Sequence, residues 1–269
     1  LASYLVEGSI TYLYYSMRLI QFPIGIFGVA MGMAVLPALS EHSVKGEMEK
    51  VKEDFSFALR LLFFITVPAM MGLIALKTPI VSALFQRGEF GYAATIGTSD
   101  ALMFYSLGIW AVVGVRVITA TFYSMQDTKT PVKVAASAMI INIIMSLLLM
   151  GPMKHSGLAF ANAIASGCNF MVLFYFLRKR LGGVGTKRIV NSFGKTLTAS
   201  LVMGVVGWFV VRSGIWTMSG YGLNKAVYLG STIIICSGIY MLLSYLLKSE
   251  EMGYIIERVR GKLRRRHAD

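Results

Sequence analysis

The sequence predicts an all-α integral membrane protein, a polytopic helical bundle, and three observations support this fold class. Hydrophobic residues make up 56% of the 269 residues, charged residues make up 14%, and the mean hydropathy is +0.66. A typical soluble chain carries about 25% charged residues. The charges also gather in short blocks, and the apolar stretches between these blocks are long enough to cross a bilayer as helices.

About seven full transmembrane helices follow from these stretches, together with the end of another. A helix of about 20 residues spans the roughly 30 Å of hydrocarbon in a bilayer. The predicted spans cover residues 10–38, 55–76, 101–125, 132–152, 156–177, 192–211 and 226–247. Residues 1–6 have the composition of the end of an earlier span, so we expect an N-terminal portion to precede them.

The basic residues are divided unevenly between the two sets of loops. Loops 40–60, 126–133 and 178–195 and the tail 248–269 hold 19 Lys and Arg, whereas the loops of the other set hold five. Cytoplasmic loops of membrane proteins carry the excess of Lys and Arg. The basic loops and the C-terminus are therefore predicted to be cytoplasmic. This distribution also argues against nucleic acid as the partner that the net charge of +13 would otherwise suggest.

Arg18 lies about ten residues into the first predicted span, within the stretch YYSMRLIQFP (14–23). A charge at the middle of a membrane helix costs about 3 kcal/mol even on lenient scales, and such residues usually face a bundle interior or a water-filled cavity. The planar guanidinium matches two phosphate oxygens at once and keeps its charge. Arg18 therefore predicts a cavity for an anionic, phosphorylated cargo. Pro23, five residues later, is expected to kink the helix.

Other polar residues in or beside the spans leave alternatives open. Arg116 either snorkels to the membrane surface or lines the same cavity. Glu7 is either a boundary residue or a partner for the arginine eleven residues further on. Asn142 and Ser146 share one helix face and, with Asn162, offer neutral oxygens either for hydrogen bonds between helices or for a cation site.

No enzymatic chemistry is legible in the sequence. It contains no pattern of a nucleophile with its base, of paired catalytic carboxylates or of clustered metal ligands. Cys168 and Cys236 lie in separate spans without the spacing of a zinc or redox motif. The glycine-rich stretch LGGVGTK (181–187) follows no strand and therefore predicts a flexible loop. We expect no cofactor and no metal.

The last two spans are rich in Gly, Val and other aliphatic residues and carry no charge beyond Lys195 near the start of the first. Their aromatic residues gather toward the outer end, as interfacial aromatic residues do: Trp208, Trp216, Tyr221 and Tyr228. The tail 248–269 then repeats apolar residues at helical spacing among Lys and Arg, namely Met252, Ile255, Ile256, Val259 and Leu263. That pattern predicts an amphipathic helix on the anionic lipid of the inner leaflet.

Four segments, in this order, resemble the MurJ/MviN family of lipid II flippases, which belongs to the multidrug/oligosaccharidyl-lipid/polysaccharide (MOP) exporter superfamily. The segments are EGSITYLYYSMRLIQFPIGIFGVAMGMAVLPALS (7–40), LFQRGEF (84–90), FYSMQDTKTPVK (122–133) and GPMKHSGLAFANA (151–163). Family members have two six-helix lobes followed by two extra helices. The resemblance implies that this chain is the second half of such a protein, and that its missing N-terminal lobe is a partner.

The resemblance also assigns the parts of the chain. Residues 1–182 correspond to the C-terminal transport lobe, from the end of helix 7 to helix 12, and residues 183–247 to the extra hairpin of helices 13 and 14. Arg18 matches the cavity arginine of helix 8, which the resemblance implies is needed for transport. The chain departs from the family where it has Ser16-Met17 in place of a frequent Ala-Asp, and where Ser146 replaces an acidic residue of some relatives.

The function that the resemblance implies is transport without covalent chemistry. Such a protein flips lipid II, a peptidoglycan precursor, from the inner to the outer leaflet of the bacterial cytoplasmic membrane by alternating access. Arg18 would hold the diphosphate of lipid II, and transport would be coupled to the membrane potential or to a monovalent cation.

Three other functions are weighed against this one. A flippase of another polyprenyl-diphosphate-linked sugar, such as an O-antigen unit, uses a similar fold. A cation-coupled multidrug exporter would favour an acidic, aromatic-lined cavity. A non-transporting scaffold gives no reason to keep Arg18 inside a span.

Overall fold

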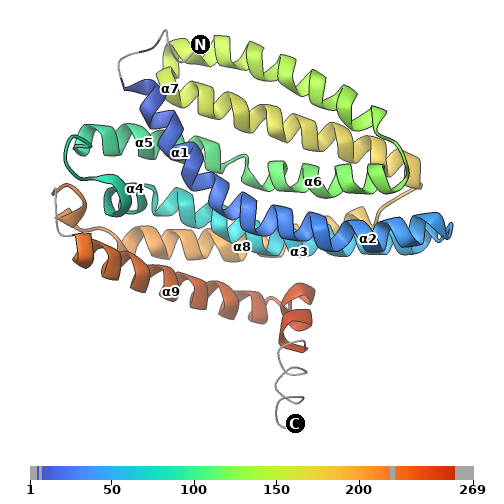
Figure 1. Ribbon diagram of the computed structural model, residues 1–269. Coiled ribbons are helices and arrows are strands. Elements are labelled where there is room, and N and C mark those ends of the chain that lie inside the picture. Colours follow the sequence, from blue (N-terminus) through green and yellow to red (C-terminus); the bar gives the residue numbers. More distant parts are fainter. Residues whose placement is uncertain (1–4, 6–7, 219–221, 258–269) are drawn as a thin grey trace.

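The computed structural model describes residues 5, 8–218 and 222–257, and for residues 27–34 it describes the backbone alone. Within these residues the secondary structure is helical and contains no strand (Figure 1). The elements are α1 (Ser9–Pro23), the π-helix η2 (Ile24–Val29), α2 (Ala30–Val44), α3 (Met48–Ala75), α4 (Lys77–Phe85), α5 (Tyr92–Ser106), α6 (Ile109–Ser124), α7 (Lys129–Leu181), α8 (Thr186–Val210), the 3-10 turn η3 (Gly214–Trp216) and α9 (Gly222–Leu246). Residues 250–257 are also helical. The all-α membrane fold predicted from the sequence is confirmed.

Five helical segments of the described chain are long and apolar enough to cross a membrane. Four of them are α3, α8, α9 and the segment Tyr92–Ser124, which combines α5 and α6. The fifth is α7, whose 53 residues contain two of the predicted spans. The first predicted span lies in the continuous helical run of α1, η2 and α2, so all seven predicted spans have a helical counterpart.

Two details of the helices differ from the sequence prediction. The third span was expected at residues 101–125, but its helix begins at Tyr92 and is interrupted between Ser106 and Ile109. The loop expected at residues 77–97 contains the short helix α4, which follows α3 after a single residue, Leu76. Both differences arise because helix ends depend on tertiary contacts that hydropathy does not record.

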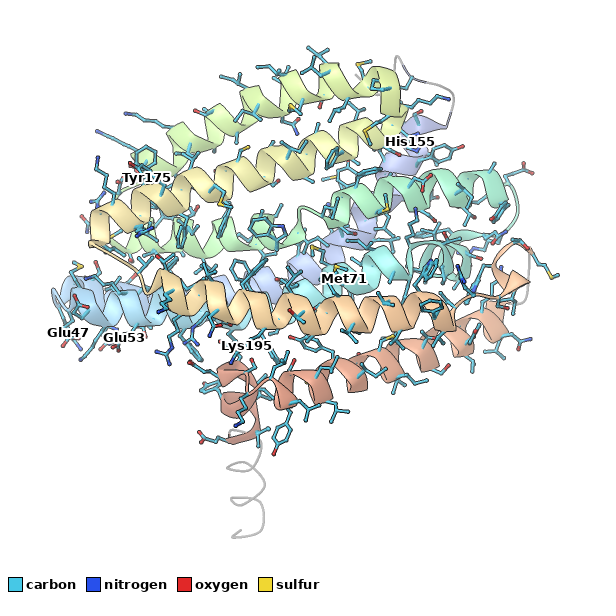
Figure 2. The ribbon with its side chains drawn as sticks, turned by 180° about the vertical axis from the view of Figure 1, so that it is seen from behind. Glu47, Glu53, Met71, His155, Tyr175 and Lys195 are labelled. Carbon is cyan, nitrogen blue, oxygen red and sulfur yellow. The ribbon has the colours of Figure 1, made fainter. Side chains whose placement is uncertain are left out.

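The loops that share an excess of positive charge lie at one end of the bundle, here called the basic end. Loops 45–47, 125–128 and 182–185 all lie there (Figure 1). Glu47 and Glu53 mark this end in Figure 2, and His155 marks the opposite end. The alternation of the predicted loops between two membrane faces is therefore reproduced by the arrangement of the helices.

The helix α7 folds back on itself as a hairpin (Figure 1). The backbone of Lys154 leaves helical geometry, with φ 52° and ψ −134°, and the two halves then run antiparallel. A Cβ atom on Gly157 would lie 2.3 Å from the carbonyl oxygen of Leu149, so only glycine fits this close approach. The segment GPMKHSG thus makes the reversal that the sequence predicted between residues 152 and 156.

The main core lies where α3 packs against α2, α6, α7 and α8. Its largest fully buried side chains include Phe55, Leu59 and Leu62 of α3, Ile118 of α6 and Leu177 of α7. Lipid tails are as apolar as these side chains, so close van der Waals packing, rather than transfer from water, holds the helices together here. The helix α3 is therefore the axis around which the other helices are arranged.

A second cluster joins α8 and α9, the hairpin assigned to residues 183–247, to α3. Phe64 of α3 packs with Met203 of α8 and with Cys236 and Tyr240 of α9. The Tyr240 hydroxyl also donates a hydrogen bond to the carbonyl oxygen of Phe64 at 2.6 Å. Because one polar atom of α9 bonds to the backbone of α3, the hairpin has a defined position on the rest of the bundle.

A buried lysine links α9 to α4 at the end opposite the basic end. Lys225 is 1% exposed, and its Nζ donates to Ser82 Oγ at 3.0 Å, to Gln86 Oε1 at 3.2 Å and to the carbonyl oxygen of Met218 at 2.5 Å. The predicted spans place this lysine in a loop, directly before the uncharged span 226–247. In the structure it lies within α9, where three neutral acceptors match its three donors.

The aromatic residues expected at the outer interface are only partly exposed. Trp208 is exposed, whereas Trp216 is buried, donates its Nε1–H to the carbonyl oxygen of Val211 and stacks on Tyr228. Tyr221 lies outside the described residues. Trp216 therefore packs within the protein, and Trp208 is the tryptophan of this group that faces outward.

Small polar residues within the helices bond to their own backbone. Thr66 donates to the carbonyl oxygen of Leu62, Ser106 to that of Leu102, and Thr121 to that of Val117, each at 2.7–2.9 Å. Such bonds to the residue four positions earlier satisfy the hydroxyl without a partner helix.

The α7 reversal generates a test with a matched control. Gly157→Ala places a methyl group against the backbone of Leu149 and should lower the free energy of unfolding by about 2 kcal/mol, as overpacking does. Gly151→Ala, in the same helix, meets nothing within 4 Å and should be neutral or slightly stabilising. Thermal unfolding in detergent measures both. A midpoint for Gly157→Ala equal to that of Gly151→Ala would contradict this packing.

Candidate functional site

The inner side of α1 is held against the bundle by small and aromatic residues. Ser16 is fully buried, and its Oγ donates to the carbonyl oxygens of Tyr12 and Leu13 at 2.8 and 3.0 Å. The ring of Tyr12 meets His155 edge-on, with centroids 5.2 Å apart. His155 Nε2 is 2.9 Å from the carbonyl oxygen of Gly97, so these contacts join α1, α5 and the α7 reversal.

A second group of aromatic contacts fixes α1 to the end of α4 and to the loop that follows it. The ring of Tyr15 lies 4.7 Å from that of Phe85 and 5.3 Å from that of Phe90. Both phenylalanines belong to the segment LFQRGEF. Tyr12, Tyr15 and Ser16 therefore turn toward the bundle, whereas Tyr14 and Met17 are exposed.

Arg18 lies on the opposite, exposed side of α1. This side also carries Tyr14, Met17 and Phe22, which are 54%, 47% and 71% exposed. Arg18 Nη2 donates to the Tyr14 hydroxyl at 3.0 Å, and its guanidinium carbon lies 5.0 Å from the centroid of the Tyr14 ring. No carboxylate pairs with Arg18 among the residues that the structure describes.

Measured along the helix, Arg18 lies well inside the run that begins with α1. It lies nine residues after Ser9, the first residue of α1, which is about 14 Å along a helix axis at 1.5 Å per residue. That distance is about half of a hydrocarbon core of roughly 30 Å. Tyr14 is a neutral partner, so the positive charge stays available to an anion.

Arg116 is exposed on α6, a helix that packs against α2 and η2. Its side chain makes no hydrogen bond or ion pair within the described part of the chain. The two arginines do not bond to each other. That Arg116 lines the same cavity as Arg18 therefore stays a prediction.

The structure shows no hydrogen bond or ion pair between the other candidate residues that it describes. Glu7 lies outside the described residues. On α7, Ser146 is buried, Asn142 is half-buried and Asn162 is exposed, and their side chains make no hydrogen bonds within the described chain. The described residues also contain no group of three His, Cys, Asp or Glu that could hold a metal ion. The cation site stays a prediction.

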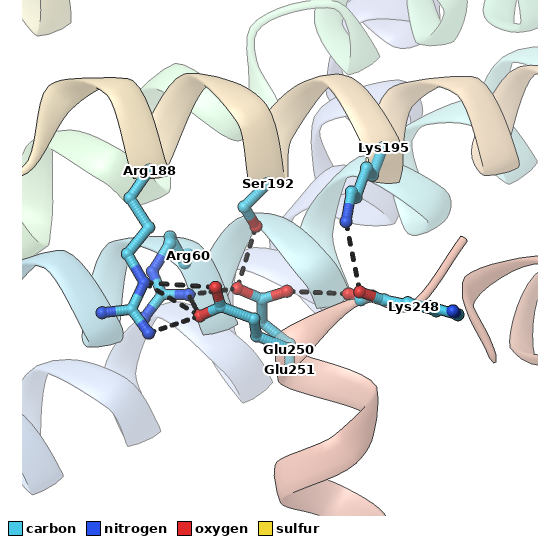
Figure 3. Close-up of polar contacts among 8 residues, drawn as sticks. Arg60, Arg188, Ser192, Lys195, Lys248, Glu250 and Glu251 are labelled. Atoms are coloured by element: carbon cyan, nitrogen blue, oxygen red, sulfur yellow. Dashed lines mark hydrogen bonds and ion pairs between the residues drawn. The ribbon is translucent and has the colours of Figure 1, made fainter. Parts of the chain in front are cut away.

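The sequence analysis missed a polar cluster at the basic end, here called the basic-end cluster: Arg60, Arg188, Ser192, Ser249, Glu250 and Glu251. Arg60 of α3 is 5% exposed and donates from Nη1 to Glu250 Oε2 at 2.7 Å and to Glu251 Oε1 at 2.9 Å. Figure 3 shows the two glutamates reaching Arg60 from the segment that follows α9. An arginine of the transport lobe is thus paired with the start of the tail.

Glu251 is the most enclosed member of the cluster. It is 2% exposed, and it also accepts hydrogen bonds from Ser192 at 2.9 Å and from Ser249 at 2.7 Å (Figure 3). A buried carboxylate needs this combination of an opposite charge and hydrogen-bond donors to remain ionised. The carboxylate therefore joins α3, α8 and the tail.

Glu250 completes the cluster on its exposed side. Arg188 of α8 donates to Glu250 from both Nε and Nη2, at 2.9 and 2.6 Å to Oε2. The Arg188 guanidinium holds the pKa of Glu250 below its ordinary value, and Arg60 acts in the same direction. Its contribution to stability is therefore present at neutral pH and is lost as the pH falls through that lowered pKa.

The first turns of the tail pack on protein rather than lying free on lipid. Met252 and Ile255 pack against the cluster formed by Phe64, Met203 and Tyr240, and Tyr254 meets Phe57 edge-on at 4.9 Å. The predicted helix is present at residues 250–257, but its apolar face is turned partly to α3 and α9. Val259 and Leu263 lie outside the described residues.

One signal in the sequence could have pointed to this cluster. Arg60 was counted with the loop 40–60, although the run FALRLLFF places it five residues inside the span predicted at 55–76. An arginine in that position needs a partner, and the adjacent acids Glu250 and Glu251 were available at the same membrane face.

The comparisons with known proteins all point to the same family. The family model described as "Lipid II flippase MurJ" matches residues 1–226. The probable lipid II flippase MurJ of Haemophilus influenzae is 34% identical over 217 residues, which cover 78% of this chain and 42% of that protein. The probable lipid II flippase MurJ of Vibrio cholerae is 34% identical over 248 residues, which cover 87% of this chain and 47% of that protein.

A solved structure has the same fold. It is described as lipid II flippase MurJ in an inward closed conformation, and it matches with a TM-score of 0.71 and 27% sequence identity. The match covers 89% of this chain and 48% of the solved chain. The chain therefore spans about half the length of the curated relatives and of the solved structure that it matches.

The basic-end cluster predicts unequal effects for its two adjacent glutamates. Glu251→Gln weakens a buried pair with Arg60 and should lower the free energy of unfolding by about 3 kcal/mol. Glu250→Gln removes a half-exposed carboxylate charge that pairs with Arg188 and Arg60, but Arg60 keeps its buried partner Glu251, so the variant should cost only about 1 kcal/mol. Thermal unfolding in detergent at neutral pH compares the two variants. Equal losses of unfolding free energy would mean that the burial of Glu251 does not add to the stability of the protein.

Proposed function

Because the chain belongs to the lipid II flippase MurJ family, we propose that it forms the C-terminal half of a transporter that moves lipid II across the bacterial cytoplasmic membrane. In this proposal an N-terminal lobe faces the exposed side of α1, and the two lobes enclose a cavity. The partial coverage of the relatives supports a missing lobe. Lipid II enters from the inner leaflet and leaves to the outer leaflet.

The observation that carries this proposal is the orientation of Arg18. Its guanidinium is exposed on α1, nine residues after the start of the helix, its partner Tyr14 is neutral, and the opposite side of α1 is packed on the bundle. Lipid II carries a diphosphate between its polyprenyl tail and its head group. A planar guanidinium binds two such oxygens together and stays charged at any physiological pH.

The mechanism requires a change of access rather than a chemical reaction. One lobe rocks against the other around the bound diphosphate, so that the cavity opens first to one side of the membrane and then to the other. No covalent bond forms or breaks, and the protein is a transporter rather than an enzyme. Arg116 is proposed as a second cationic group for the same cargo because its side chain is exposed and unpaired within the described chain.

The energy source in this proposal is the membrane potential or a gradient of a monovalent cation. Asn142, Ser146 and Asn162 would supply neutral oxygens for such a cation. The names of the relatives reported above point to lipid II, and none of them points to an O-antigen flippase or a multidrug exporter.

The proposed orientation places the basic end in the cytoplasm, and it can be tested with two single cysteines. In a background lacking Cys168 and Cys236, Lys129→Cys lies at the basic end and Lys154→Cys at the opposite end. An impermeant thiol reagent added to intact cells should label only Lys154→Cys, and permeabilised cells should show labelling of both. Labelling of only Lys129→Cys in intact cells would reverse the orientation.

The transport proposal is tested by Arg18 variants in a protein that contains both lobes. Arg18→Ala removes the phosphate-binding group and should abolish growth of a strain depleted of its own lipid II flippase. Insertion should be preserved, since removing a charge makes insertion easier. Arg18→Lys keeps the charge without the two-point fork and should retain partial function at most.

Lys179→Ala is the matched control for this experiment. Lys179 is an exposed cation at the basic end whose side chain bonds to nothing in the described part of the chain. Its variant should support normal growth and normal lipid II export. Normal lipid II export by Arg18→Ala at native expression would overturn the proposed role of Arg18.

A further inference from the structure

We propose that a groove between α3 and α8, at the end opposite the basic end, is a binding site for an anionic glycerophospholipid. One acyl chain lies on the apolar floor of the groove, and the phosphate contacts Arg212. None of the groove-lining residues belongs to α1, which carries Arg18, so this site is separate from the proposed cargo site. The inference does not depend on the proposed transport function.

The floor of the groove is apolar and open to the side. The groove has a volume of about 490 Å³, and Met71 and Ile74 of α3 face Leu201, Gly204 and Val205 of α8 across it. A Cβ atom on Gly204 would lie 3.6 Å from Met71 Cε, so the absence of a side chain there deepens the floor. Leu201 and Val205 are 46% and 54% exposed, which leaves the groove open to lipid.

The length of the groove suits one acyl chain. Leu201 and Arg212 are eleven residues apart, and a helix rises 1.5 Å per residue, which gives about 16 Å along α8. One leaflet contributes about half of a hydrocarbon core of roughly 30 Å. A chain that begins at the level of Arg212 therefore ends near Leu201, without leaving its own leaflet.

The mouth of the groove carries one uncompensated positive charge. Lys77 Nζ pairs with Asp100 Oδ1 at 2.7 Å, so these two charges cancel. The Arg212 guanidinium carbon lies 4.0 Å from the centroid of the Trp208 ring, and no carboxylate pairs with it among the described residues. The Thr78 hydroxyl lies at the same mouth and has no hydrogen-bond partner in the described chain. One cation and one hydroxyl suit a single phosphodiester.

The aromatic residues place this mouth at the membrane surface. Trp208, which is exposed, and Trp216 both line the groove. Tryptophan prefers the depth of the lipid head groups, where its ring meets apolar chains on one side and polar groups on the other. The phosphate of a membrane lipid lies at this depth, and the bilayer supplies that lipid at high local concentration.

The test uses the tryptophans of the groove as reporters. The chain has one other tryptophan, Trp110, which packs against the main core, so Trp110→Phe leaves Trp208 and Trp216 as fluorophores. The protein is reconstituted in mixed vesicles in which either phosphatidylglycerol or phosphatidylcholine carries brominated chains, which quench nearby tryptophan. We expect phosphatidylglycerol to be preferred about fivefold, the effect of one basic contact with an anionic lipid.

Two variants separate the head-group contact from the floor. Arg212→Ala should lower the ratio of phosphatidylglycerol to phosphatidylcholine binding to about one. Arg87→Ala removes an exposed arginine at the same end but outside the groove, and it should leave this ratio unchanged. Gly204→Leu fills the floor and keeps Arg212, and it should reduce quenching by both lipids. An unaltered preference in Arg212→Ala, or equal quenching by both lipids in the parent, would overturn the proposal.

Native mass spectrometry of the detergent-extracted protein gives an independent measurement. The parent and Arg87→Ala should retain phosphatidylglycerol, and Arg212→Ala and Gly204→Leu should not, while all four keep the thermal midpoint of a folded protein. Retention of a polyprenyl diphosphate in place of the phospholipid would assign the groove to cargo and reject the proposal. A dimer that Arg212→Ala dissociates would reject it as well, because a second copy would then cover the groove.

Discussion

A bilayer offers no hydrogen-bond partner, so a polar group inside it must find one within the protein. This constraint accounts for most polar contacts in the structure. Thr66, Ser106 and Thr121 bond to their own helices, and Lys225 uses all three of its donors on neutral acceptors. Arg18 departs from this pattern, because its donors are largely unused and its side chain is exposed inside the first predicted span.

The polar contacts that satisfy this constraint also attach the last hairpin to the rest of the bundle. At one end Lys225 bonds α9 to α4, and at the other end Glu251 joins α3, α8 and the start of the tail. Between them Tyr240 bonds to the backbone of α3. Since these attachments lie at three depths along the helices, α9 can neither slide nor tilt on α3 without breaking at least one of them.

Hydropathy and charge alone were enough to obtain the all-α membrane fold, the seven spans and the grouping of the loops at two ends. These features follow from the composition of long segments and need no knowledge of neighbours. The short helix α4, the break after Ser106 and the basic-end cluster depend on contacts between segments far apart in the chain, so no local pattern contains them. The burial of Arg60 is the clearest case, since its partners lie about 190 residues away.

The candidate site, too, could be predicted from the sequence only in part. The presence and depth of Arg18 could be predicted from the sequence, because an arginine inside an apolar run is a local feature. Which side of α1 it occupies could not, because that side is decided by the contacts of Tyr12, Tyr15 and Ser16 with other segments. The contact of Arg18 with cargo is a proposal, and the cation site of Asn142, Ser146 and Asn162 stays a prediction, because no contact within the described chain tests either of them.

The π-helix η2 has a consequence for the helical phase of the first span. A helix of i→i+5 hydrogen bonds holds one more residue per turn than the α-helix, so the ladder resumes about 100° out of phase at Ala30. A single helical wheel drawn from Ser9 to Val44 would therefore place the faces of α2 wrongly relative to that of Arg18. Loss of one residue between Ile24 and Val29 would give a regular α-turn and leave Arg18 and α2 facing as they do now, whereas the same six residues wound as an α-helix would rotate Arg18 by about 100° against everything that α2 contacts, so in this segment the number of residues matters as much as their identity.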